Sequence, residues 1–494
     1  MLNRIALAGA LAVMSGFATL AAAQSNPDLP EMGNPAGLLA NLDEEYEIGQ
    51  MVIRQLREQN MLIDDPESAD YVQSLGLRLS SQAPDSSRQF HYLMMNDGEI
   101  NAAALPGAFI VLNYGTVLAS NTESELAAVL AHETAHVVQR HLVRGALAAE
   151  HASIETAAAM LGAILLGVLG GGAPAIEGGL LAAQGMGAQM QINFTRDQEY
   201  EADRVGMGFL ANAGFDPLGM PGFFEAFYRH YGYGNDLYVP KMLMNHPVTS
   251  ERIAEARNRA AQLQRPKNVR DTLSYGLVKE RLRVLTAADT FDLGAYYARH
   301  MAVKDPPLEV QYGQALALYQ RDHAAQAVEL LKPLVAKYQG MIMLHSLLGQ
   351  AQMAAGQQTE ALVTFEHAEQ LFPRNVPLTV RYAETLIKAN RPEQAHALLL
   401  DLFNNVPPTP AQIKLTALAA SGAGDAGDAY YYMGEYDISG GQLTLAVQQL
   451  ELALASPEIT VVQRKRFQAR LKEVRDVLAE DRRVHGASAQ NGGR

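Results

Sequence analysis

The pattern of apolar and polar positions predicts a chain made mostly of helices, with one short series of strands near its beginning. Two amphipathic helices are expected near 43–60 and 67–81. Beyond them, three apolar runs bounded by turn residues are typical of strands. The predicted strands cover 90–95, 100–104 and 109–112. A helix over 126–141 follows, and its apolar flanks predict that it lies buried.

The second half of the chain repeats itself every 34 residues, in frames that start at 308, 342 and 376. Small residues recur at the eighth and twentieth positions of each frame, where they let two helices approach closely. These residues are Ala315, Gly349, Ala383, Ala327, Ala361 and Ala395. This is the tetratricopeptide period and pattern. A fourth copy fits a frame at 427, so 410–421 is predicted as one unpaired helix, and 463–481 as a capping helix.

These patterns predict a mainly α protein in which an α+β domain with a small sheet is followed by an α-solenoid of tetratricopeptide repeats. Stacked helix pairs build an extended groove, so we expect a protein partner on the concave face of the repeats. The predicted segments are a signal peptide (1–23), a flexible lead-in (24–40), the first domain (41–265), a helical connector (266–305), the repeat domain (306–482) and a disordered tail (483–494).

The beginning of the chain has the composition of a secretory signal. Arg4 gives a positive start, 5–20 is apolar, and three alanines at 21–23 offer a small-residue cleavage site. A membrane anchor is the alternative, which the short apolar stretch disfavours. The chain has no cysteine, which excludes disulfides and a lipid anchor at the cleavage site and is compatible with an oxidising periplasm.

The net charge is −14, and removal of the predicted signal peptide, with its single charge at Arg4, makes it −15. An acidic protein is repelled by the phosphates of nucleic acids. The composition therefore excludes nucleic acid as a general partner.

The helix predicted over 126–141 carries the motif His132-Glu133-x-x-His136. The spacing of four residues places both imidazoles on one helix face, so both can bind one metal ion. Glu133 lies about 100° round the helix, where it can reach a water on the metal without binding the metal itself. Zn²⁺ lowers the pKa of such a water to roughly 7. The motif therefore predicts one Zn²⁺ per chain and a hydrolytic enzyme with Glu133 as general base.

A zinc site of this type needs a third protein ligand, and two carboxylates are candidates. Glu155 follows the motif closely. Glu199 lies further along, four residues before Asp203 on a predicted helix. One carboxylate of that pair can bind the metal while the other holds a ligand histidine by its second nitrogen. We favour Glu199 as the ligand and Asp203 as the holding group.

Three sequence runs resemble the HtpX-like and CAAX-protease class of zinc metallopeptidases. They are Asn101-Ala-Ala-Ala-Leu-Pro-Gly107, Glu199-Tyr-Glu-Ala-Asp203 and His246-Pro-Val-Thr-Ser-Glu-Arg252-Ile253. The resemblance implies a gluzincin-like fold in which His246 and Arg252 face the zinc and stabilise the tetrahedral intermediate. A histidine at this place could instead supply a fourth zinc ligand and close the site. Ala108 departs from the pattern, because a second glycine is common there.

The strand that contains Asn101, Ala102, Ala103 and Ala104 could pair with an extended peptide if it lies at the sheet edge, so these residues are candidates for substrate binding. Packing of the sheet on the zinc helix is the simpler alternative.

A long uncharged stretch within 157–195 contains Gly170-Gly-Gly172 and Pro174, which disfavour a membrane span. A flap over the site, or a patch that touches a membrane or partner, is the alternative.

The signal peptide, the HtpX-like domain and the repeats together resemble BepA-like periplasmic metallopeptidases. This resemblance implies a periplasmic zinc endopeptidase that degrades misfolded or stalled outer-membrane proteins and assists their assembly. It also implies docking on the outer-membrane assembly machinery through the repeats. The implied location is the periplasm, either free or bound peripherally to the outer membrane. The alternative is a catalytically restrained chaperone or scaffold that acts mainly through its repeats.

Overall fold

The computed structural model describes residues 42–84, 88–148, 196–231, 242, 246, 248–267 and 269–491. The predicted signal peptide and lead-in, the candidate ligand Glu155 and the uncharged stretch of 157–195 lie outside these described residues. Within them, no helix is both long enough and apolar enough to cross a membrane.

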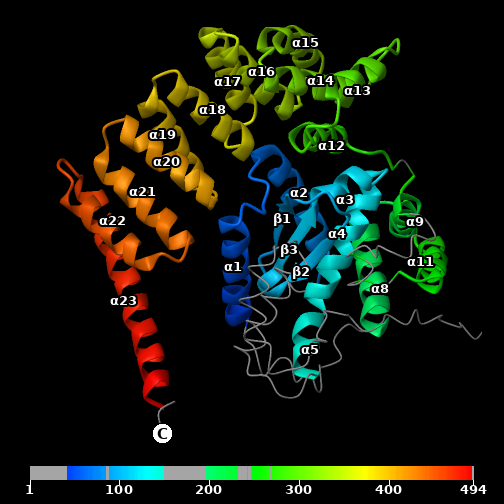
Figure 1. The fold of residues 1–494 in the computed structure, drawn as a ribbon, viewed down its shortest axis with the longest axis horizontal. Coiled ribbons are helices and arrows are strands. Elements are labelled where there is room, and N and C mark those ends of the chain that lie inside the picture. Colours follow the sequence, from blue (N-terminus) through cyan, green and yellow to red (C-terminus); the bar gives the residue numbers. More distant parts are fainter. Residues whose placement is uncertain are drawn as a thin grey trace, which may run out of the picture.

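A three-stranded sheet forms as predicted, from β1 (His91–Met95), β2 (Ala102–Leu105) and β3 (Phe109–Asn113). Its order is β1-β3-β2, with β1 parallel and β2 antiparallel to β3, so β2 lies at one edge (Figure 1). The turn between β2 and β3 needs left-handed backbone at both Gly107 (φ 73°) and Ala108 (φ 62°). A second glycine would suit this turn, since a side chain in that region costs about 1–2 kcal/mol.

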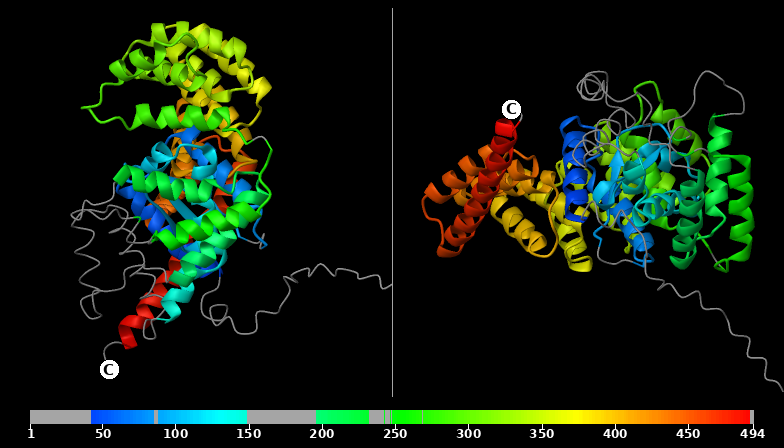
Figure 2. Two further views of the ribbon diagram at one scale, coloured as in Figure 1. Left: turned by 90° about the vertical axis from the view of Figure 1, so that its right-hand side faces the viewer. Right: turned by 90° about the horizontal axis from the view of Figure 1, so that it is seen from below.

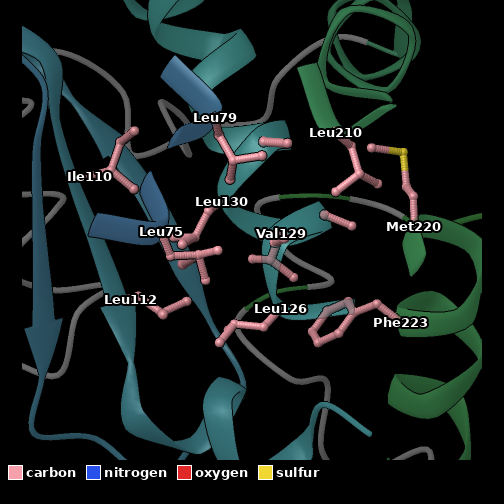
Figure 3. Close-up of a cluster of buried hydrophobic side chains, with 14 of the residues drawn as sticks. Leu75, Leu79, Ile110, Leu112, Leu126, Val129, Leu130, Leu210, Met220 and Phe223 are labelled. Atoms are coloured by element: carbon pink, nitrogen blue, oxygen red, sulfur yellow. The ribbon is translucent and has the colours of Figure 1, made fainter. Parts of the chain in front are cut away.

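Helix α4 (Glu123–Val138) is the centre of the first domain, and all of its residues up to Val137 are buried. A helix that is covered on every side must be packed from several directions at once. It lies between the sheet and three further helices, α2 (Pro66–Ser80), α8 (Arg196–Asn212) and α9 (Gly219–Tyr231). Figure 3 shows this core, with its labelled side chains from β3, α2, α4, α8 and α9 packed together. The opposite face of the sheet is covered by α1 (Leu42–Glu58).

The predicted helix of 126–141 is shorter than expected at its end. Its start is capped by Thr122, whose Oγ1 accepts a hydrogen bond from the Glu125 amide at 3.2 Å. Helix α4 ends at Val138, Arg140 has a left-handed backbone (φ 51°), and α5 (His141–Ala148) begins at once. The prediction that His141 continues the zinc helix is therefore wrong, because the chain turns sharply at Arg140.

The predicted repeats are confirmed as helix pairs, and their positions in the sequence are confirmed too. Their first helices, α14 (Leu308–Gln320), α16 (Ile342–Ala354) and α18 (Val376–Lys388), begin at the three predicted frame positions. Their second helices are α15 (Ala324–Lys337), α17 (Gln358–Leu371) and α19 (Pro392–Phe403). A Cβ added to Gly349 would lie 2.3 Å from the Phe365 ring, so only a residue without a side chain allows this helix pairing.

Further helices join the two parts and end the chain. They are α11 (Ser250–Gln262), α12 (Leu273–Leu285), α13 (Leu293–Met301), α20 (Pro410–Gly422), α21 (Ala426–Ser439), α22 (Leu443–Ala455) and α23 (Val461–Asn491). Helix α20 packs on both α19 and α21, so it continues the array and is not isolated. Helix α23 passes the position 483 where we predicted a disordered tail, because no proline interrupts this stretch and most of its residues tolerate a helix.

The repeat array curves around the first domain on the side of α1 and α2 (Figures 1 and 2). Two acids at the start of α2, Asp65 and Glu67, are buried against Arg281 of α12 and Arg381 of α18. Arg281 donates to Asp65 at 2.6 and 2.7 Å, and Ser346 of α16 donates to Glu67 at 2.7 Å. The first helices of the early repeats therefore bind the first domain itself. This contact leaves less of the concave face for a protein partner than we expected.

Burial alone would raise the pKa of Asp65, but the charges of Arg281 and Arg381 lower it far more. A carboxyl whose pKa is lower in the folded protein stabilises the fold at pH values above its unfolded pKa of 3.8. This contribution is lost as the pH falls below that value towards the folded pKa.

We predict that Arg281→Ala destabilises the protein by about 3–5 kcal/mol, because it removes a cation from a buried cluster and leaves two carboxylates undercompensated. Urea denaturation at neutral pH measures this loss. The control is Arg475→Ala, since Arg475 and its partner Glu451 are 54% and 50% exposed, and such pairs contribute little. An Arg281→Ala protein as stable as the control would contradict the prediction.

Candidate metal centre

The structure brings together the side chains of the four ligands predicted from the sequence. His132 and His136 of α4, Glu199 of α8 and His246 are all buried, and one ligand atom from each lies within 4.8 Å of the others. The Nε2 atoms of His132 and His136 are 2.9 Å apart. His246 Nδ1 lies 3.0 Å from Glu199 Oε1 and 3.4 Å from His132 Nε2, and His136 Nε2 lies 3.4 Å from Glu199 Oε1.

These separations fit a single metal ion. Two ligand atoms that each lie about 2 Å from a tetrahedral ion are about 3.3 Å apart. The observed separations between neighbouring ligand atoms run from 2.9 to 3.6 Å. Three imidazoles and a carboxylate, all removed from water, form a donor set that a divalent cation would hold together. The residues present therefore fit the metal that the sequence predicted.

Close contact between α4 and α8 positions the two carboxylates of the Glu199-x-x-x-Asp203 pair. Ala202 is fully buried, and a Cβ added to Gly206 would lie 2.8 Å from the backbone oxygen of Ala131. Larger side chains at these positions would push α8 away from α4. The small residues thus let Glu199 and Asp203 reach the two histidines.

Asp203 and Arg252 hold the ligands in place. Asp203 Oδ1 lies 2.9 Å from His132 Nδ1, the ring nitrogen that faces away from the other ligands. Arg252 donates two hydrogen bonds of 2.8 Å to Asp203, and its Nη1 lies 2.6 Å from Glu199 Oε2. Because this guanidinium contacts both acids, it compensates the negative charge that the metal ligands bring into the core.

The electrostatics of the site follow from these contacts. Burial alone would lower the pKa of His132. The hydrogen bonds to Asp203 and Glu199 outweigh this effect and raise the pKa to about 10. Burial raises the pKa of Glu199, yet the charge of His246 and the hydrogen bonds from the histidines hold it well below its usual range. The pKa of His136 lies well below 6.5, and burial is the main cause. The site thus keeps Glu199 ionised and ready to bind a cation.

The proposed general base Glu133 lies beside the cluster and is only 1% exposed. Its Oε2 has no hydrogen-bond partner among the described residues, and its Oε1 lies 3.5 Å from His246 Nε2. The imidazole of His246 therefore stands between Glu133 and the other ligands. Its two ring nitrogens thus face Glu133 and Glu199.

A small apolar pocket adjoins His132 and Glu133, on the side of α9. It is lined by Ala128, Val129, Met220, Phe223, Phe224 and Met242. Its free volume of about 10 Å³ leaves room for roughly one water molecule in this conformation. No pattern in the sequence predicts this pocket, since its walls come from three separate segments.

The candidate substrate residues lie at or next to the edge strand. Asn101 precedes β2, and Ala102, Ala103 and Ala104 belong to it. All four side chains are at least 90% buried, so only the backbone edge of the strand could meet a peptide. Their role in substrate binding stays a prediction.

One residue of the site was missed by the sequence reasoning. His141, the first residue of α5, lies with its Nδ1 2.8 Å from His136 Nδ1. Its presence five residues after a ligand histidine is a signal, but five residues along a continuous helix would place the two rings on different faces. Only the break at Arg140 brings them together.

The chain matches known proteins over both of its parts. Residues 66–260 match Peptidase family M48, and residues 352–421 match the tetratricopeptide repeat. The beta-barrel assembly-enhancing protease of Yersinia pestis is 31% identical over 452 residues, which cover 90% of this chain and 91% of that protein. The protease of the same name from Escherichia coli K12 is 31% identical over 473 residues, 94% of this chain and 95% of that one.

The mitochondrial metalloendopeptidase OMA1 of Arabidopsis thaliana matches a shorter part of the chain. It is 30% identical over 133 residues, which cover 27% of this chain and 24% of that protein. The match to Peptidase family M48 spans all four residues of the metal centre. The family comparison and the geometry of the structure therefore identify the same region of the chain. The chain belongs to the family of beta-barrel assembly-enhancing proteases, and its catalytic domain is a metalloprotease of Peptidase family M48.

Proposed function

We propose that this protein is a periplasmic zinc endopeptidase that degrades misfolded or stalled outer-membrane proteins and assists their assembly. One observation carries the proposal: a buried cluster of three imidazoles and a carboxylate lies beside Glu133, in a chain whose relatives are beta-barrel assembly-enhancing proteases. The apolar side chains that line the wall beside the cluster would suit a substrate with exposed apolar side chains, such as an unfolded protein, once the site opens.

Zinc is the metal that this donor set suits best. His132, His136 and Glu199 are the combination of two imidazoles and one carboxylate that catalytic zinc sites use. When bound, Zn²⁺ supplies a Lewis acid that polarises the substrate carbonyl and acidifies a water. Asp203 would fix His132 with its Nε2 towards the ion, because a carboxylate can only accept a hydrogen bond from Nδ1.

Glu133 acts as the general base in this proposal. Its unpartnered Oε2 is available to accept a proton from the attacking water, and the same carboxyl can later give the proton to the leaving amine. Burial excludes other water from the site and so strengthens this exchange. Arg252 compensates the charge of Glu199 and Asp203, and its expected contact with the tetrahedral intermediate stays a prediction.

His246 restrains the resting enzyme as a fourth ligand. Its Nδ1 faces Glu199 while its Nε2 faces Glu133, so the ring keeps a water away from the base. Pro247 restricts the backbone at His246 and favours one presentation of the ring. Cleavage then requires His246 to move away, after which the same residue could assist the intermediate.

The repeats connect the peptidase to the outer-membrane assembly machinery. Because the first helices of the early repeats bind α2, we assign docking to the later helices. Apolar side chains that are between 46% and 77% exposed support this assignment, and they are Leu418, Leu445, Leu452, Val461 and Val462. Isolated exposed apolar residues are ordinary, but several of them on the last helices of one array, here α20, α22 and α23, favour a protein interface.

Glu133→Gln should keep the fold and the zinc and lose peptidase activity by several orders of magnitude, because base and metal act together on one water. Casein cleavage and zinc content, measured beside the wild type, test this expectation. Full activity in the variant would contradict the proposed mechanism.

The two carboxylates considered as third ligand can be separated by matched substitutions. Glu199→Gln should lower the zinc content of the purified protein, since an amide oxygen is a weaker ligand than a carboxylate. Glu155→Gln should leave the zinc content at the wild-type level. The opposite pattern, measured by atomic emission, would reassign the ligand to Glu155.

Removal of His246 distinguishes restraint from assistance by the sign of its effect. If His246 restrains the site, His246→Ala should raise basal casein cleavage, whereas a residue needed only for the intermediate would lower it. The constants kcat and KM are measured separately, because easier access and slower turnover can offset each other. His300→Ala, a change at an exposed histidine of α13, is the control. Lower kcat with unchanged KM in His246→Ala would rule out the restraint.

A further inference from the structure

The two ligand histidines of α4 are held by unlike partners on the side that faces away from the metal. His132 Nδ1 meets the carboxylate of Asp203. His136 Nδ1 meets another imidazole, that of His141, at 2.8 Å. His141 continues the contact to α8, since its Nε2 lies 3.1 Å from Glu201 Oε2. A line of three side chains therefore runs from the metal ligand His136 through His141 to a carboxylate.

The backbone is shaped to make this contact. The left-handed residue Arg140 turns the chain between α4 and α5, so that His141 is directed back towards His136. Arg140 is itself fixed by an ion pair with the buried Glu45 of α1. A left-handed backbone at a residue with a side chain is unfavourable by about 1–2 kcal/mol and persists where surrounding contacts enforce it. Here the ion pair with Glu45 and the buried position of His141 are such contacts.

The proton positions along the line follow from the chemistry of the ends. When His136 binds a metal through Nε2, its Nδ1 keeps a proton and can only donate. His141 Nδ1 must then accept, which leaves the proton of His141 on Nε2. That proton points to Glu201, a carboxylate that can only accept, and Arg144 also donates to the same oxygen at 3.2 Å. Each of these two hydrogen bonds then pairs a donor with an acceptor, so metal binding through His136 Nε2 selects the tautomer of both rings.

We propose that His141 is a positioning residue for the metal, which fixes the tautomer and the ring orientation of His136 through this hydrogen bond. The inference rests on the proposed zinc site. It assigns His136 a neutral acceptor, whereas His132 has an anionic one, so His132 is the stronger electron donor of the two. His141, Glu201 and the turn at Arg140 thus belong to the metal site, although none of them touches the metal.

The test compares the full-length wild type with His141→Phe and His141→Asn. Phenylalanine fills the space but offers no acceptor, so the affinity for Zn²⁺ should fall roughly 10- to 100-fold, as it does when other partners of ligand histidines are removed. Asparagine places an acceptor oxygen where His141 has Nδ1, so His141→Asn should recover most of the affinity. Competition with a fluorescent zinc chelator measures all three proteins.

The control is His345→Phe, the same change at a buried histidine of the repeat helix α16, which should bind Zn²⁺ like the wild type. The visible absorption of the Co²⁺-loaded proteins gives a second readout, since it reports the geometry around the metal. We expect a shifted spectrum for His141→Phe and a near-normal one for His141→Asn. Thermal unfolding in the presence of chelator checks that the metal-free variants keep the wild-type fold.

Two results would overturn the inference alone: equal zinc affinity in His141→Phe and the wild type, or a loss in His141→Phe that His141→Asn shares in full. The second result would mean that the hydrogen-bond acceptor is irrelevant. A wild-type protein that binds no Zn²⁺ would instead overturn the proposed function and this inference with it. Because each result is a ratio of affinities, none depends on peptidase activity.

Discussion

The direct contact of helices α4 and α8 is the constraint on which the metal centre depends. The ligands His132 and His136 come from one helix and Glu199 from the other, and their atoms must meet within a few ångströms. Ala202 and Gly206 permit this approach because neither carries a bulky side chain. Since α4 is buried on all sides, the sheet and the surrounding helices hold it rigidly. The core therefore exists as much to fix the ligands as to stabilise the fold.

Charge is the second constraint, because the centre buries three carboxylates within one region. Glu199 and Asp203 share Arg252, and the metal would neutralise the remaining charge on the ligand side. Glu133 is left without a hydrogen bond to its Oε2 among the described residues, a condition that costs stability. An unsatisfied group of this kind at a metal centre is typical of a catalytic residue, since proton transfer needs a vacant acceptor.

The repeats and the peptidase share a buried ionic cluster and are not independent modules on a flexible linker. Asp65 and Glu67 stand at the beginning of α2, which packs against α4, and the arginines that pair with them come from α12 and α18. A buried cluster of this type tolerates little relative movement, because its charges would be left unpaired. The cluster therefore links the repeats to a helix that packs on α4.

The sequence alone determined the elements whose signals are local. The periodicity of 34 residues predicted the starts of α14, α16 and α18. The motif at His132 indicated a metal ion, and the spacing of Glu199 and Asp203 indicated a further ligand and a group that holds a ligand histidine. Only the tertiary structure decided that Arg140 breaks the helix, that His141 turns back to His136 and that Arg281 joins the two parts. These features depend on contacts between residues far apart in the chain, and such contacts leave no periodic pattern in the sequence.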